Sequence, residues 1–146
     1  MLFCNVQFKD VIGQIAIKQQ LVNMYQQNRL SHALLFLGKE GAGGLSLARA
    51  FAQYIVCEQI NGKGSQVSQA ASLFGEDVSL PTPTKDVTDS CGVCPACQKA
   101  AKLIHPDIHY SYPVITKKPG EAPLSSDYAA DWRDFILQNP YGNTFD

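Results

Sequence analysis

Hydrophobic residues recur at helical spacing in several stretches of the chain. Apolar side chains fall on one face between Ile15 and Gln27, and they form a clear amphipathic stripe between Leu45 and Cys57. A third, shorter helix is expected from Ala96 to Leu103. The segment His105-Pro106-Asp107 should end it, because a residue that precedes proline disfavours the helical conformation.

A fourth helix is expected near the end of the sequence. Ser126 is a suitable N-cap residue, since its hydroxyl can accept a hydrogen bond from an otherwise unpaired backbone N–H. This helix should end before Pro140. Its large side chains at helical spacing are Tyr128, Trp132, Phe135 and Ile136.

Two other segments have the pattern of strands. Ala33–Leu37 is a short, continuous apolar run that ends at a glycine, which is typical of a strand buried on both faces of a parallel sheet. Ile108–Val114 alternates apolar and polar residues, and Pro113 favours a place near the sheet edge. Together with the helices, these strands predict an α/β fold of three layers, with right-handed crossovers between parallel neighbours.

The composition is that of an ordinary globular domain. Of 146 residues, 45% are hydrophobic and 17% are charged, and the net charge is −1. Lys117-Lys118 is the single adjacent basic pair, so no basic patch for nucleic acid is visible. No stretch approaches the roughly 20 apolar residues that cross a bilayer, and the first residues do not resemble a signal peptide. A cytoplasmic protein is therefore expected.

A glycine-rich loop joins the first predicted strand to the helix that follows. A working phosphate-binding loop reads G-x-x-x-x-G-K-[ST] at such a junction. Its lysine reaches the β- and γ-phosphates, and its Ser/Thr hydroxyl holds Mg²⁺. Here Gly38 and Gly43 occupy the glycine positions, whereas Gly44 replaces the lysine and Leu45 replaces the Ser/Thr. The loop is therefore a degenerate P-loop that lacks both chemical groups.

Neighbouring residues are poorly placed to replace those groups. Ser46 comes one position late, and Lys39 lies in the loop, where a lysine is usually solvent-exposed. We expect no ATP hydrolysis and weak or no nucleotide binding. Gly41, Gly43 and the first N–H groups of the helix can still form an anion nest. On the glycine pattern alone, a simple turn without a ligand is the alternative.

Three cysteines form the tight knuckle Cys91-Gly-Val-Cys94-Pro-Ala-Cys97. This spacing lets thiolates converge on one ion, and Zn²⁺ prefers four ligands in a tetrahedral array. Five cysteines in a chain with no sign of secretion favour metal binding or free thiols over disulfides. A redox pair and unrelated free thiols are the alternatives, but two overlapping C-x-x-C pairs fit structural zinc better.

The fourth zinc ligand has three candidates. Cys57 lies at the end of the helix after the glycine loop and is the preferred one. Cys4 lies in an apolar segment and is better explained as a small buried hydrophobic residue. His105 follows the knuckle and also competes. Coordination by four thiolates leaves no open position for water, so the site would be structural.

Several motifs, taken in order, resemble the N-terminal region of bacterial DNA polymerase III clamp-loader subunits. They are Val11-Ile12-Gly13-Gln14, the segments 29–36 and 47–52 with the glycine loop between them, and the cysteine knuckle followed by His105-Pro106-Asp107. The resemblance implies a P-loop NTPase fold of the AAA+ type. Residues 1–146 would be the N-terminal part of that domain, within a longer protein. Residues 57–105 would be an inserted zinc module with a flexible segment at 61–90.

Within this family the gamma/tau subunits carry an intact phosphate-binding loop, whereas the delta-prime subunit can lack it. Gly44 and Leu45 therefore favour the delta-prime subunit, a noncatalytic stator of the complex that loads the sliding clamp onto primed DNA. The resemblance implies gamma/tau and delta subunits as partners, the sliding clamp as a further candidate, and only indirect contact with DNA. An apolar face left by the missing part of the fold is expected to favour self-association.

Two other functional classes compete with this interpretation. A P-loop ATPase subunit of the gamma/tau type would need a lysine that reaches the loop. A zinc-stabilised nucleic-acid-binding module would need basic and aromatic residues around the knuckle. Lys99 and Lys102 are present there, but Asp89 and Asp107 offset them. No catalytic residue is assigned.

Overall fold

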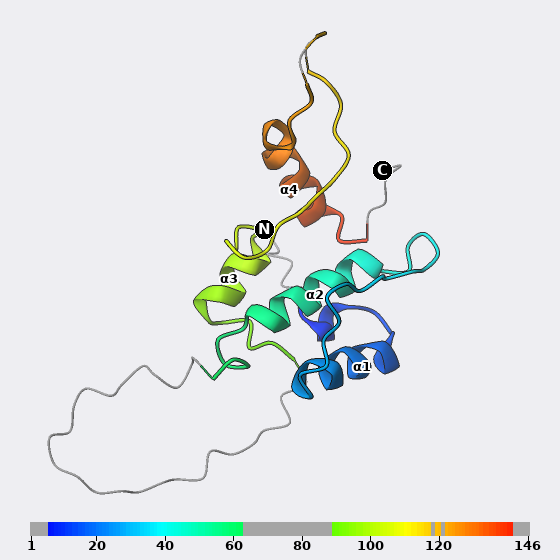
Figure 1. Ribbon diagram of the computed structural model, residues 1–146, viewed down its shortest axis with the longest axis vertical. Helices are drawn as coiled ribbons and strands as arrows, with labels where there is room; N and C mark the ends of the chain where they lie inside the picture. The colour runs from blue at the N-terminus through cyan, green and yellow to red at the C-terminus, as the bar shows by residue number, and fades with distance from the viewer. Residues whose placement is uncertain (1–5, 63–88, 118, 121, 142–146) are drawn as a thin grey trace, which may run out of the picture.

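The computed structural model describes residues 6–62, 89–117, 119–120 and 122–141. Within these ranges every regular element is a helix. In chain order they are η1 (Phe8–Asp10), α1 (Ile15–Gln26), α2 (Gly44–Val56), α3 (Pro95–Ala101), η3 (Ser125–Tyr128) and α4 (Ala129–Gln138). Helix α2 is central: α1, η1 and α3 all pack against it, and α4 lies on the side of α2 that is away from α1 (Figure 1).

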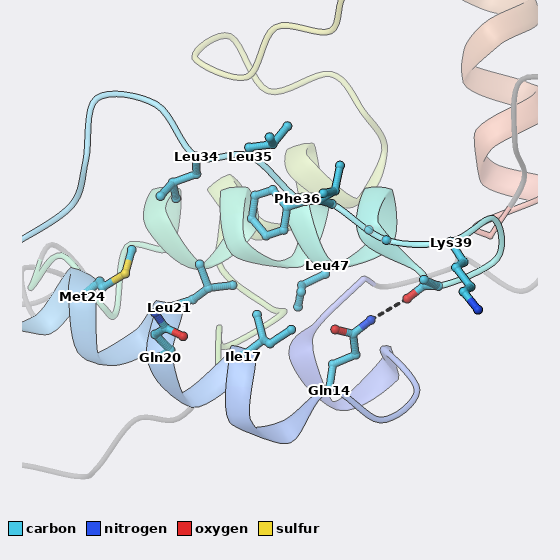
Figure 2. Close-up of a pocket in the computed structure, with 14 residues that line it drawn as sticks. Gln14, Ile17, Gln20, Leu21, Met24, Leu34, Leu35, Phe36, Lys39 and Leu47 are labelled. Carbon is cyan, nitrogen blue, oxygen red and sulfur yellow. Dashed lines mark hydrogen bonds between the residues drawn. The ribbon is translucent and has the colours of Figure 1, made fainter.

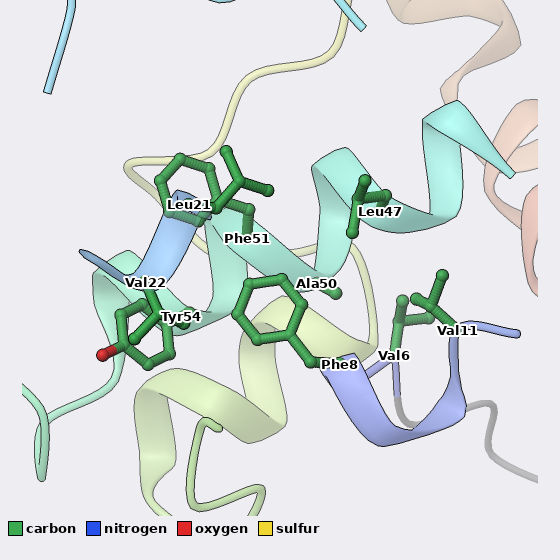
Figure 3. Packing of buried hydrophobic residues seen from close by; sticks show 9 residues of the cluster. All are labelled: Val6, Phe8, Val11, Leu21, Val22, Leu47, Ala50, Phe51 and Tyr54. Atoms are coloured by element: carbon green, nitrogen blue, oxygen red, sulfur yellow. The ribbon is translucent and has the colours of Figure 1, made fainter. Parts of the chain in front are cut away.

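The hydrophobic core lies between α2, α1 and the N-terminal segment (Figure 3). Apolar residues of α2 recur three or four positions apart and so form one stripe along the helix. Ala50 and Tyr54 in this stripe have no exposed surface. The Phe8 ring from η1 lies 5.7 Å from the Tyr54 ring and 6.4 Å from the Phe51 ring, measured between centroids. The buried cluster consists of Val6, Phe8, Val11, Leu21, Val22, Leu47, Ala50, Phe51 and Tyr54.

The prediction of a strand at Ala33–Leu37 is wrong for this structure. The segment is extended beside α2, but it forms no backbone ladder with any other described segment. Leu35 is 84% exposed and Leu37 is 89% exposed, while Phe36 packs against the core. A strand exists only where a neighbour supplies backbone hydrogen-bond partners, and an apolar run by itself does not provide them.

The predicted strand at Ile108–Val114 is also wrong, because here the side chains pack against a helix. The Tyr112 ring stacks on Trp132 of α4 at 4.7 Å and 5°, and the Tyr110 ring lies 4.8 Å from Trp132. Burial raises the pKa of the Tyr110 hydroxyl, and the nearby Arg49 guanidinium opposes this shift. The α/β prediction, a three-layer AAA+-type P-loop NTPase fold with a parallel sheet, is thus overturned for the described part of the chain.

The predicted helices are present, with small differences at their ends. Ser126 does not cap the last helix, because it lies inside η3, and Tyr128 occupies the N-cap position of α4 without a side-chain bond. Helix α3 ends before His105-Pro106-Asp107. Leu103 adopts a left-handed conformation with φ of 57°, and the Ile104 N–H donates to the Lys99 carbonyl. Backbone geometry at Leu103, and not the proline, therefore ends α3. No described helix is both long and apolar enough to cross a membrane.

Candidate metal centre and glycine loop

Four cysteine thiols gather at the C-terminal end of α2. Cys57 is the C-cap residue of α2, Cys94 is the N-cap residue of α3, and Cys97 lies in the first turn of α3. The sulfurs of these three and of Cys91 all lie within 4.8 Å of one another. Packing of α3 against α2 therefore brings together the four residues that the sequence proposed as ligands.

The spacing of the sulfurs suits a metal ion better than a disulfide. The Cys91 and Cys97 sulfurs are 3.8 Å apart. A disulfide needs about 2.05 Å between its sulfurs. Four sulfurs at about 2.3 Å from a tetrahedral zinc ion would be about 3.8 Å apart, and the Cys91–Cys97 pair has this separation.

Backbone N–H groups point at three of the sulfurs. The Cys91 N–H donates to the Cys57 sulfur at 3.4 Å, the Cys94 N–H to the Cys91 sulfur at 3.3 Å, and the Cys97 N–H to the Cys94 sulfur at 3.4 Å. Cys57 and Cys97 are fully buried, and burial raises the pKa of the Cys97 thiol. A divalent cation bound here would supply the positive charge that compensates buried thiolates.

His105, a competing fourth ligand, does not join this cluster. The Nδ1 atom of His105 accepts a hydrogen bond from the Asp107 N–H at 3.2 Å, and His105 is not part of the cysteine group. Cys4 lies outside the described residues, as does most of the segment 61–90 that was predicted to be flexible.

The glycine loop lies at the opposite end of α2. Gly43 is the N-cap residue of the helix with φ of 76°, and Gly41 has φ of 74°. L-residues with a side chain rarely adopt such angles, so both glycines serve the turn. The Ala42 N–H donates to the Lys39 carbonyl at 3.0 Å, and the Gln14 side chain donates to the Ala42 carbonyl at 2.6 Å.

The C-terminal turn covers this loop. A Cβ atom placed on Gly43 would lie 2.7 Å from a carbon of the Tyr141 ring. The Tyr141 hydroxyl accepts a hydrogen bond from the Ile12 N–H at 2.8 Å, and the Ser46 hydroxyl donates to the Pro140 carbonyl. Tyr141 was not identified from the sequence, where only Pro140 was taken to indicate the end of a helix.

The residues considered as replacements in the loop are otherwise engaged or point away. Ser46 is 2% exposed and its hydroxyl is bonded to the C-terminal turn, so it is not directed at a bound ion. Lys39 is exposed, and its side chain points away from the apolar residues of the neighbouring groove (Figure 2). Leu45 is 40% exposed and offers no oxygen ligand.

An apolar groove of about 420 Å³ lies between α1, the extended segment and the start of α2 (Figure 2). Its floor is formed by residues that also belong to the core or border it, including Leu21, Phe36 and Leu47. Gly38, Gly44 and Lys39 form the end of the groove nearest the loop. Gln14, Gln20 and Lys39 line the groove together with the apolar side chains.

Comparisons with known proteins address the region around the glycine loop. Residues 13–74 match the family model described as "DNA polymerase III, delta subunit". The DNA polymerase III subunit tau/gamma of Haemophilus influenzae is 48% identical over 50 residues, 34% of this chain and 7% of that protein. Subunit tau of Bacillus subtilis is 45% identical over 51 residues, 35% of this chain and 9% of that protein.

A longer match covers more than half of the chain. The gamma/tau subunit of Mycoplasma pneumoniae is 28% identical over 86 residues, 59% of this chain and 13% of that protein. The matches thus span only a small part of the length of these relatives. No solved structure matches the chain.

The structure defines a helical unit with a glycine-rich loop at one end of its central helix and a candidate structural metal centre at the other. Over part of its length, the chain is therefore similar to gamma/tau-like clamp-loader subunits of DNA polymerase III. The family resemblance drawn from the motifs is therefore confirmed.

Proposed function

We propose that this chain is part of a noncatalytic clamp-loader subunit of the delta-prime type, which helps to assemble the complex that loads the sliding clamp in DNA replication. The observation that carries the proposal is the state of the glycine loop. Gly44 and Leu45 supply neither a cation for phosphates nor a hydroxyl for Mg²⁺, and Tyr141 packs on Gly43. The match to a family described as a DNA polymerase III delta subunit supports a role in the clamp loader.

The glycine loop would then have a structural role. It keeps the start of α2 in a fixed position relative to the extended segment and the C-terminal turn. A neighbouring ATPase subunit would recognise this shape rather than a bound nucleotide. The proposed partners are gamma/tau and delta subunits, with the sliding clamp as a further candidate and DNA contacted only indirectly. The family relationship supports these partners.

We also propose that Cys57, Cys91, Cys94 and Cys97 hold one structural Zn²⁺. Mutual sulfur distances, the buried positions and the N–H donors all support zinc bound by four thiolates. When bound, the ion would supply folding energy and no catalysis, because no coordination position is left for water. It would fix α3 to the end of α2.

ATPase activity of the full-length protein tests the proposed function. We expect steady-state turnover equal to buffer and no binding of Mg-ATP tighter than the millimolar range. The informative control replaces Gly44 by Lys and Leu45 by Thr together, which restores the missing groups. Hydrolysis by the unmodified protein at the rate of an active gamma/tau subunit would replace the noncatalytic proposal with the ATPase alternative.

Assembly provides the second test. The full-length protein should copurify with gamma/tau and delta subunits. Assembly of an active loader at normal yield without this protein would remove the proposed role.

A further inference from the structure

We propose that Gln7, Gln53, Asp89 and Ser90 form an outer layer around the metal centre, and that this layer couples metal binding to docking of the N-terminal segment 6–11. The inference rests on the proposed zinc site. It concerns residues that are not ligands but that hold the backbone on the N-terminal side of the knuckle. They act as positioning residues.

Gln7 contacts the backbone on both sides of Cys91. Its side-chain amide donates to the Ser90 carbonyl. The same amide lies so close to Gly92 that a Cβ atom there would be 3.0 Å from the Gln7 Oε1 atom. Gln7 is 4% exposed, although glutamine is mostly found on protein surfaces. The buried Gln7 amide therefore holds the backbone on both sides of Cys91 and so fixes the position of the Cys91 side chain.

Gln53, on α2, also contacts Ser90, the residue before Cys91. Its amide donates to the Ser90 hydroxyl at 3.1 Å, and it is 2% exposed. Gln53 precedes Cys57 by four positions, so the two side chains lie on one face of α2, about one turn apart. Helix α2 thus supplies one thiol and one hydrogen bond to the knuckle.

Asp89 links the knuckle to the N-terminal segment through charge-assisted hydrogen bonds. Its carboxylate accepts from the backbone N–H groups of Phe8 at 3.0 Å, Lys9 at 3.0 Å and Ser90 at 2.7 Å. Because Phe8 is a core residue, these bonds connect the metal centre directly to the core. Bonds of this kind are about twice as strong as bonds between neutral groups.

Coupling follows from this geometry. When segment 89–91 is ordered, Cys91 is held in place to bind the ion. Conversely, a bound ion holds Cys91 and thereby orders segment 89–91. The same segment carries the acceptors that hold the N–H groups of 8 and 9. By thermodynamic linkage, metal binding must then stabilise docking of segment 6–11 by the same factor by which docking raises metal affinity.

Zinc affinity of variants of the full chain tests one half of this linkage, using competition against a chromogenic chelator. Outer-shell partners of metal ligands typically change metal affinity by about 10- to 100-fold. We expect a loss of about 10-fold for Asp89→Ala, with a smaller loss for Gln7→Met. Asp107→Ala is the matched control, since Asp107 is an exposed carboxylate near the knuckle, and its affinity should stay within about 2-fold of the wild type.

Hydrogen exchange of the unmodified protein tests the other half and does not depend on how the variants fold. Removal of zinc should speed amide exchange in segment 6–11 more than in α1, which serves as the internal reference. Unchanged zinc affinity of Asp89→Ala, or unchanged exchange of segment 6–11 after zinc removal, would overturn the coupling while leaving the metal site in place. Failure of the unmodified protein to bind zinc would instead overturn the proposed metal site.

Discussion

The two ends of α2 differ in what they have kept. At the N-terminal end the chain has a glycine-rich loop in which Gly44 and Leu45 offer neither an ammonium group nor a hydroxyl, and Tyr141 packs on Gly43. At the C-terminal end the chemical groups are present, since four thiols lie within 4.8 Å of one another. Helix α2 therefore begins at a loop without cationic or hydroxyl groups for a phosphate and its metal ion, and it ends at four possible metal ligands that backbone N–H groups support.

The difference teaches how to judge a degenerate motif. A glycine loop can be retained for its shape, because Gly43 is needed both for its positive φ and for the close approach of Tyr141. Cysteines cannot be explained by shape in the same way. Four of them at metal-binding distance, with N–H donors on three sulfurs, form an arrangement that a turn or a core does not require.

The largest expected effect comes from breaking the metal centre. Cys97→Ser should lose stoichiometric zinc and cost several kcal/mol of stability, because a buried ligand and the metal-dependent folding energy are lost together. Elemental analysis and thermal unfolding measure both quantities. Cys57→Ser should behave in the same way.

Cys4→Ser is the matched control for these cysteine variants, since Cys4 was judged a poor ligand from the sequence. It should keep one equivalent of zinc. Full zinc in Cys57→Ser, or loss of zinc in Cys4→Ser, would mean that the fourth ligand is misassigned. Less than about a tenth of an equivalent in the unmodified protein would remove the tetrahedral site altogether.

The next effect concerns the closed glycine loop. Gly43→Ala should destabilise the protein by about 2–3 kcal/mol, since it combines a positive φ with a Cβ atom 2.7 Å from the Tyr141 ring. Gly41→Ala is the control: it also has a positive φ, but nothing lies within 4 Å of its Cβ, so it should cost only about 1–2 kcal/mol. Chemical denaturation measures the difference. Equal costs would show that Tyr141 does not press on the loop in solution.

A smaller effect is expected at the bond that holds the C-terminal turn. Ser46→Ala removes the hydroxyl that donates to the Pro140 carbonyl and should cost about 1 kcal/mol. Tyr141→Phe removes the acceptor of the Ile12 N–H and should cost a similar amount. Additive losses in the double variant would contradict a single cooperative turn, because contacting groups should couple.

The sequence predicted the helices well because their signals are local. Amphipathic spacing placed α1 and α2 within one residue of their observed ends. The strands failed because strand formation depends on a partner that the local pattern does not contain. The segment Ala33–Leu37 has the apolar composition of a buried strand, but its Leu35 and Leu37 are largely exposed in the described structure.

The candidate site shows the same division. Cysteine spacing identified the knuckle, and the structure then brought Cys57 to it through the packing of α3 on α2. Gln7, Asp89 and Tyr141 could not be found, because their roles arise from contacts between residues far apart in the sequence. Gln53 left one usable signal: it is a polar residue one turn before a proposed ligand on a helix whose other face is apolar.

The smallest expected effect tests whether the glycine loop has lost nucleotide binding or still binds nucleotide through a different lysine. Lys39 is the one lysine within the glycine loop, so a loop that still binds nucleotide would depend on its ammonium group. Because its side chain is exposed and points away from the groove (Figure 2), Lys39→Ala should change the free energy of unfolding by less than about 0.5 kcal/mol. It should also leave the weak stabilisation by inorganic phosphate unchanged, since any such anion would be held by backbone N–H groups at the start of α2.

Thermal unfolding across a phosphate titration measures both effects, with Lys9→Ala as the matched control at an exposed lysine away from the loop. If Lys39→Ala abolished a phosphate or Mg-ATP response that Lys9→Ala retained, Lys39 would be replacing the missing lysine, and the contrast between the two ends of α2 would no longer hold.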